Sequence, residues 1–140
     1  MTVAMADKAH PVETLPVALV VDDSPVQLRL VGDVLGRNGY SVKTVPSAEA
    51  ALQALATVLP VVIISDVVMS GMSGLELCQK VRSDAKFKHI PVILLTGETQ
   101  PRDFKAGSDA GAVMYVAKPF QPEKLLNAVR LVCSLHPKNA

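Results

Sequence analysis

Short apolar runs alternate with helical patterns along this 140-residue chain, and the alternation restricts the folds that it can adopt. Runs this short and this apolar suit strands that are covered on both faces, and they are far shorter than the ~20 residues needed to span a bilayer. We therefore predict an α/β fold, in which a doubly wound five-stranded parallel sheet carries helices on both faces. We predict no membrane span. The candidate strands are residues 17–21, 41–45, 61–65, 91–95 and 113–116.

Helix signals separate these strands. Ser24 is a predicted cap with Pro25 at the first helical position, and this helix is expected to end at about 36–38. Ser47 caps a second, alanine-rich helix, and apolar residues between 75 and 81 mark a third. A weaker pattern covers 101–110, and Gln121 or Pro122 opens the last helix. We expect one domain over residues 16–136, with a flexible lead over 1–15 and a tail over 137–140.

Composition excludes several classes of protein. The formal net charge is +1 and the basic residues are not clustered, which argues against direct binding of nucleic acid. Cys78 and Cys133 lie in separate helical patterns, so we interpret both as packing residues, and the scattered histidines predict no metal site. The N-terminus lacks the features of a secretory signal, so the cytoplasm is the expected compartment.

Reactive side chains follow four of the predicted strands, at ends that meet along one edge of a parallel sheet. They are Asp22 and Asp23 after the first strand, Asp66 after the third, Thr96 after the fourth and Lys118 after the fifth. Crowded carboxylates repel one another unless a cation lies among them, and hard oxygen ligands favour Mg²⁺, for which Mn²⁺ can substitute. A carboxylate beside such an ion, with a hydroxyl and an ammonium nearby, suits the acceptance of a phosphoryl group.

These five residues, together with Pro119 and Phe120 after the lysine, resemble the response regulator receiver family over residues 17–135. The resemblance implies the flavodoxin-like (βα)5 receiver fold and a phosphoacceptor domain of two-component signalling. That domain catalyses only its own phosphorylation and slow dephosphorylation, so we do not expect a true enzyme. The implied site residues are Asp66 as phosphoacceptor, Asp22, Asp23, Asp66 and the backbone carbonyl of Val68 as Mg²⁺ ligands, and Thr96 and Lys118 as partners of the phosphoryl oxygens.

Further features of the resemblance concern switching and loop geometry. Tyr115 matches the family's switch aromatic, which turns inward when a threonine-type hydroxyl is drawn to the phosphoryl group. In this chain that hydroxyl belongs to Thr96. The Lys118–Pro119 bond matches a junction that is cis in the family. Two positions depart from the usual pattern, because Ser70 replaces a common proline and Gly97 stands where alanine often follows the threonine.

The resemblance also implies partners. A sensor histidine kinase or a histidine phosphotransfer protein is the expected phosphoryl donor, and a protein target is expected to read the face of the fourth helix, fifth strand and fifth helix. The first helix carries two apolar stripes, of which only one can face the sheet. We hypothesise that the second stripe docks the donor, while packing against the last helix or a second copy remains the alternative. The first stripe consists of Leu28, Val31 and Leu35. The second consists of Val26, Leu30 and Val34.

Two rival functions share part of this pattern with a phosphoacceptor. An aspartate-dependent phosphatase would share the Asp66 nucleophile but normally needs a second carboxylate two residues later, where this chain has Val68. A flavin or nucleotide binder would need a glycine- or hydroxyl-rich phosphate loop after the first strand, and Asp22 and Asp23 there would repel phosphate. The tail follows the last helix directly, so we expect a regulator acting through protein contacts or a part of a longer protein.

Overall fold

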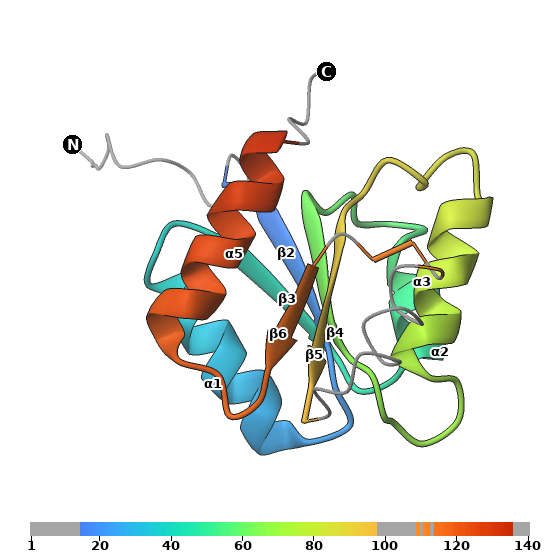
Figure 1. The fold of residues 1–140 in the computed structure, drawn as a ribbon. Helices are drawn as coiled ribbons and strands as arrows, with labels where there is room; N and C mark the ends of the chain where they lie inside the picture. The colour runs from blue at the N-terminus through green and yellow to red at the C-terminus, as the bar shows by residue number, and fades with distance from the viewer. Residues whose placement is uncertain (1–14, 98–108, 110, 113, 136–140) are drawn as a thin grey trace.

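The computed structural model describes residues 15–97, 109, 111–112 and 114–135, and its strands form one parallel sheet. The sheet has five strands in the order β3-β2-β4-β5-β6 (Figure 1). All four neighbouring pairs are parallel. The strands are β2 (Val17–Val21), β3 (Ser41–Val45), β4 (Val62–Asp66), β5 (Val92–Thr96) and β6 (Met114–Ala117).

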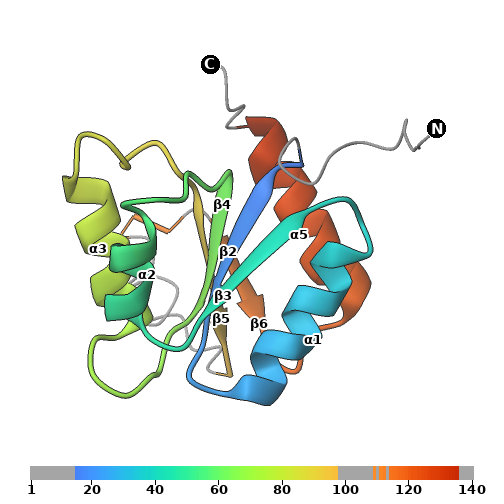
Figure 2. The same ribbon diagram turned by 180° about the vertical axis from the view of Figure 1, so that it is seen from behind.

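The helices divide between the two faces of this sheet. In Figures 1 and 2, α1 and α5 lie on one face, while α2 and α3 lie on the other. Three of them begin at a serine whose hydroxyl accepts a backbone N–H of the first turn, which satisfies a donor that the helix itself leaves unpaired. The helices are α1 (Pro25–Gly36), α2 (Ala48–Ala54), α3 (Gly74–Ser83) and α5 (Pro122–Leu135).

Alternate strand residues feed two separate apolar cores. Leu19 of β2 and Leu94 of β5 are fully buried on the side that α2 and α3 cover. Their neighbours Val20 and Ile93 point to the other face and pack with α1 and α5. Strands buried on both faces carry apolar side chains at nearly every position, which is why these segments are continuous apolar runs in the sequence.

The predicted elements agree with the structure within one or two residues at their ends. The strand predicted at 61–65 begins at Val62 and includes Asp66, and the first helix ends at Gly36 as expected. The weak helical pattern at 101–110 falls outside the described residues, apart from Asp109, and so does position 113 at the predicted start of β6. Across the described ranges, the helices are too short or too polar to cross a membrane.

The order of the strands creates one position where the chain changes direction across the sheet. From β2 the chain continues outward to β3 on one side, whereas β4 pairs with the other side of β2. The connections therefore diverge between β2 and β4, and in open α/β sheets the crevice at such a point is the usual ligand site. The carboxylates that end β2 and β4 lie at this point.

Candidate functional site

Three carboxylates from two strands converge at the crevice between β2 and β4. Asp22 and Asp23 follow β2, and Asp66 is the last residue of β4. One ligand atom from each of the three lies within 4.8 Å of the others. Asp22 and Asp66 are buried and Asp23 is exposed, so the cluster opens to solvent on the Asp23 side. The structure thus brings together the three residues that the sequence nominated as metal ligands through their side chains.

Asp22 is the deepest of the three and is incompletely bonded. Its Oδ1 accepts the Ser24 backbone N–H at 2.9 Å, but its Oδ2 is buried without a hydrogen-bond partner. Burial raises the pKa of the Asp22 carboxyl above its ordinary value, and Asp66 and Asp23 add to the rise against the opposing Ser24 N–H and Lys118. A buried carboxylate oxygen without a partner is costly, and a hard divalent cation is the group that this donor set fits.

Asp66 forms an ion pair with the lysine that follows β6. Lys118 Nζ lies 2.9 Å from Asp66 Oδ1, and the Val67 backbone N–H donates to the same oxygen at 3.0 Å. Both contacts use Oδ1, which leaves Oδ2 of this carboxylate outside them. The β6–α5 junction that presents the lysine contains the cis peptide bond between Lys118 and Pro119, as the resemblance implied.

Thr96 and Tyr115 occupy the neighbouring strands. Thr96 ends β5 and is 3% exposed, and its carbonyl accepts the Lys118 backbone N–H at 2.7 Å. Tyr115 lies on β6, beside β5, and packs half-buried against the core on the α2 and α3 side. Asp66, Thr96 and Lys118 therefore lie at the ends of three adjacent strands, β4, β5 and β6.

The loop between β4 and α3 contributes features that the sequence did not predict. Ser70 donates its backbone N–H and its hydroxyl to Asp23. At the start of α3, a Cβ on Gly74 would overlap the carbonyl oxygen of Asp66, so only glycine allows the helix this close to the aspartate. The residue two positions after Asp66 is Val68, an apolar residue that is 73% exposed, so no acidic side chain stands at that position. A glycine shortly after Asp66 was the only available signal of the close approach.

The first helix buries one of its two predicted stripes. Val31 and Leu35 are fully buried, while Val26 is 68% and Leu30 is 50% exposed. Val34 differs from the other two residues of the outer stripe, because it packs partly against the core beneath α1 and α5. The outer stripe borders a groove beside the β6–α5 junction that is lined by Gln27, Leu30, Val34, Lys118, Pro119, Phe120 and Pro122.

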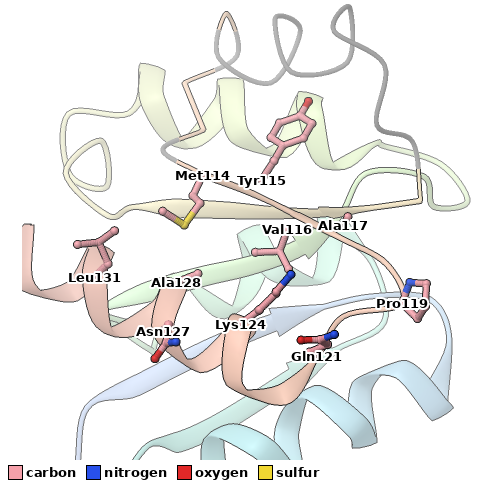
Figure 3. Close-up of a pocket in the computed structure, with 10 residues that line it drawn as sticks. All are labelled: Met114, Tyr115, Val116, Ala117, Pro119, Gln121, Lys124, Asn127, Ala128 and Leu131. Atoms are coloured by element: carbon pink, nitrogen blue, oxygen red, sulfur yellow. The ribbon is translucent and has the colours of Figure 1, made fainter.

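A second hollow lies along β6 and α5. Figure 3 shows Met114 and Val116 on the side of α5, with Tyr115 between them pointing to the opposite side of the strand. The α5 wall includes Lys124, Asn127 and Leu131, and Leu131 is 48% exposed. The sequence analysis expected the target-binding face on this strand and this helix, and the predicted fourth helix of that face falls outside the described residues.

Comparison with known proteins agrees with this geometry. Residues 18–130 match the response regulator receiver domain family. The chemotaxis protein CheY1 of Helicobacter pylori is 38% identical, over 81% of this chain and 94% of that protein. The DNA-binding response regulator MtrA of Mycolicibacterium smegmatis is 33% identical over 80% of this chain, which spans only 48% of MtrA. The structure of the chemotaxis response regulator CheY4 of Vibrio cholerae matches with a TM-score of 0.80 and 37% identity, over 85% of this chain and 99% of that one.

The family match covers most of the chain, and the strands and helices have the arrangement of the solved relatives. The resemblance seen in the sequence and the flavodoxin-like fold that it implied are therefore confirmed. The chain belongs to the response regulator receiver domain family, the phosphoacceptor domains of two-component signalling.

Proposed function

We propose that Asp66 accepts a phosphoryl group from a phosphohistidine protein with the help of Mg²⁺, and that this changes a surface read by a second protein. The observation that carries the proposal is the acidic cluster itself. Its three carboxylates lie within 4.8 Å, one has a buried oxygen without a partner, and a lysine pairs with Asp66. A site with this charge pattern suits a ligand that brings both a cation and phosphoryl oxygens.

Asp66 is the nucleophile in this proposal. An Asp66 carboxylate oxygen forms a bond to phosphorus as the bond between phosphorus and the histidine nitrogen breaks, and the leaving imidazole takes a proton from solvent. The Lys118 ammonium and the Thr96 hydroxyl stabilise the negative charge on the transferred oxygens. Asp22, Asp23, Asp66 and the Val68 carbonyl would hold Mg²⁺, for which Mn²⁺ can substitute; the ion would neutralise phosphoryl oxygens during transfer.

Switching in this proposal involves β5 and β6, which carry Thr96 and Tyr115. Once Thr96 is drawn toward a phosphoryl group on Asp66, Tyr115 on the next strand rotates inward and changes the surface of β6. The hollow along β6 and α5 is a candidate contact for the downstream protein target (Figure 3). Tyr115 supports this assignment, because it is half-buried and lies on β6 between Met114 and Val116, which line the hollow.

The phosphodonor docks on α1 in this proposal. Val26 and Leu30 are exposed apolar residues, and the adjoining groove includes Lys118, which pairs with Asp66. A sensor histidine kinase or a histidine phosphotransfer protein that covered this groove would bring its phosphohistidine close to Asp66. Such docking suits a helical partner whose apolar face matches the stripe.

The chain acts as a signalling domain in the cytoplasm rather than as a turnover enzyme or a nucleic-acid binder in this proposal. The absence of an acid/base carboxylate at Val68 favours a phosphoryl group that is lost slowly. The formal net charge of +1 gives little attraction for nucleic acid. The domain spans residues 16–136, slightly beyond the 18–130 that match the family.

Labelling with acetyl phosphate tests the central claim. Incubation with acetyl phosphate and Mg²⁺ should add the mass of one phosphoryl group to the intact protein, and EDTA should prevent the addition. Asp66→Asn should abolish the label, whereas the matched change Asp33→Asn on the exposed side of α1 should leave it intact. Undiminished labelling of the Asp66→Asn protein would contradict the assignment of the nucleophile.

A further inference from the structure

The loop after β4 is bonded directly to the acidic cluster through one serine. The Ser70 backbone N–H donates to Asp23 Oδ2 at 3.0 Å, and the Ser70 hydroxyl donates to the same oxygen at 3.3 Å. The two residues are 47 positions apart in the chain, so these bonds join the end of β2 to the loop between β4 and α3. Both bonds use Oδ2, which leaves Oδ1 of Asp23 outside them.

Asp23 needs such a restraint more than its neighbours do. Its side chain is exposed, whereas Asp22 and Asp66 are buried, so packing does not fix its orientation. Repulsion from the two buried carboxylates favours rotation of Asp23 toward solvent when no cation is present. Two donors on Oδ2 oppose that rotation, because it would break both hydrogen bonds to this oxygen.

A second carboxylate holds the same loop from the other side. The Met72 backbone N–H donates to Glu49 Oε2 of α2 at 3.3 Å. Between the two anchors, Gly71 adopts a φ of +77°, which favours glycine. The loop is therefore fastened by Asp23 through Ser70 and by Glu49 through Met72, and only the first of these anchors is a candidate metal ligand.

We propose that Ser70 is a positioning residue for the divalent cation, which it serves by holding Asp23 in the orientation that binds metal. The inference rests on the proposed function, because it takes Asp23 as a metal ligand. Proline at position 70, which is common in the family, has no backbone N–H and no hydroxyl, so it could supply neither bond. The serine gives this chain a direct link between its metal ligand and the loop that carries the Val68 carbonyl.

Calorimetric titration of the unphosphorylated protein with Mg²⁺ tests this role without any measurement of activity. Ser70→Thr keeps both donors and should bind Mg²⁺ within about twofold of wild type, and Ser70→Ala keeps the backbone bond and should bind about twofold more weakly. Ser70→Pro loses both bonds and should bind about three- to tenfold more weakly. Glu49→Ala, which removes only the other anchor, should leave the affinity unchanged.

Amide hydrogen exchange provides a readout that does not depend on the proline variant. The Ser70 amide should exchange faster in Asp23→Ala than in wild type, because its acceptor is gone, while the Met72 amide should not change. Equal exchange of the Ser70 amide in the two proteins would overturn the proposal even if Ser70→Pro did not fold.

The titrations separate failure of this inference from failure of the proposed function. A wild-type protein that binds no Mg²⁺ would overturn both. Binding by wild type with equal affinity in Ser70→Pro would overturn the positioning role alone. Equal weakening by Glu49→Ala and Ser70→Pro would also overturn it, because general stiffness of the loop would then explain the effect.

Discussion

Asp22 illustrates at the level of one residue how a binding site reduces stability. Its buried Oδ2 lacks a partner, and burial is the main cause of its raised pKa. The folded protein therefore holds the Asp22 proton more tightly than the unfolded chain does. Ionisation of Asp22 consequently reduces stability as the pH rises through its folded-state pKa, and the loss is recovered as the pH falls below that value.

Replacement of this carboxylate should stabilise the metal-free protein. We expect Asp22→Asn to raise the free energy of unfolding by about 1 kcal/mol at neutral pH in EDTA, because asparagine can still accept the Ser24 N–H without a buried charge. The gain should shrink as the pH is lowered toward the ordinary aspartate pKa of 3.8. Urea unfolding across this range measures both effects, and a gain that grew on acidification would contradict the explanation.

Asp23 and Thr96 should separate metal binding from switching. Asp23→Ala should weaken Mg²⁺ binding by about tenfold or more and slow phosphorylation by acetyl phosphate, because a ligand is lost. Thr96→Ala should leave Mg²⁺ affinity nearly unchanged while uncoupling Tyr115 from phosphorylation. Calorimetry provides the first measurement, and tyrosine fluorescence in a Tyr40→Phe background, where Tyr115 is the remaining tyrosine, provides the second. Equal Mg²⁺ affinity of wild type and Asp23→Ala would count against this division.

Helix α3 approaches strand β4 closely because a glycine stands at the contact. A Cβ on Gly74 would meet the backbone of Asp66 rather than a movable side chain. We expect Gly74→Ala to cost about 2 kcal/mol of unfolding free energy and to slow phosphorylation, because helix and acceptor cannot both keep their places. Gly36→Ala is the matched control, since a Cβ there meets nothing within 4 Å. Equal stability of the two variants by thermal unfolding would show that α3 moves away without cost.

The exposed stripe of α1 allows a test of phosphodonor docking. The double change of Val26 and Leu30 to serine should reduce phosphotransfer from the cognate phosphohistidine protein by about tenfold or more, because apolar contact area is lost. Labelling by acetyl phosphate should not change, since the site is untouched. Leu59→Ser, at an equally exposed leucine away from α1, serves as the control. Unaltered transfer to the double variant would rule out docking on this stripe.

Across the whole molecule, one cation should stabilise the entire fold, because the cluster joins the ends of β2 and β4 at the centre of the sheet. Mg²⁺ at about 100 times its dissociation constant should add about 2.7 kcal/mol to the free energy of unfolding, and EDTA should remove it. Urea unfolding with and without Mg²⁺ measures the difference. Stabilisation of Asp23→Ala by the same amount would place the bound ion elsewhere.

The sequence alone was sufficient to predict the strands, most helix starts and the residues that end the strands. Ser24 and Ser47 cap helices where predicted, because capping and apolar periodicity depend on residues within a few positions of one another. Asp66 and Lys118 could be nominated for the same site, since parallel strands end along one edge. The family resemblance added the residue roles and the cis bond at Lys118.

Only the tertiary structure decided what depends on distant packing. Strand order puts β2 beside β4, and helix packing buries Val31 while it leaves Leu30 exposed. The bonds from Ser70 to Asp23 and the approach of Gly74 to Asp66 leave no periodic pattern in the sequence. Their partners are brought together by the packing of helices and strands, and local rules of backbone conformation and burial carry no information about which loop will lie against which strand end.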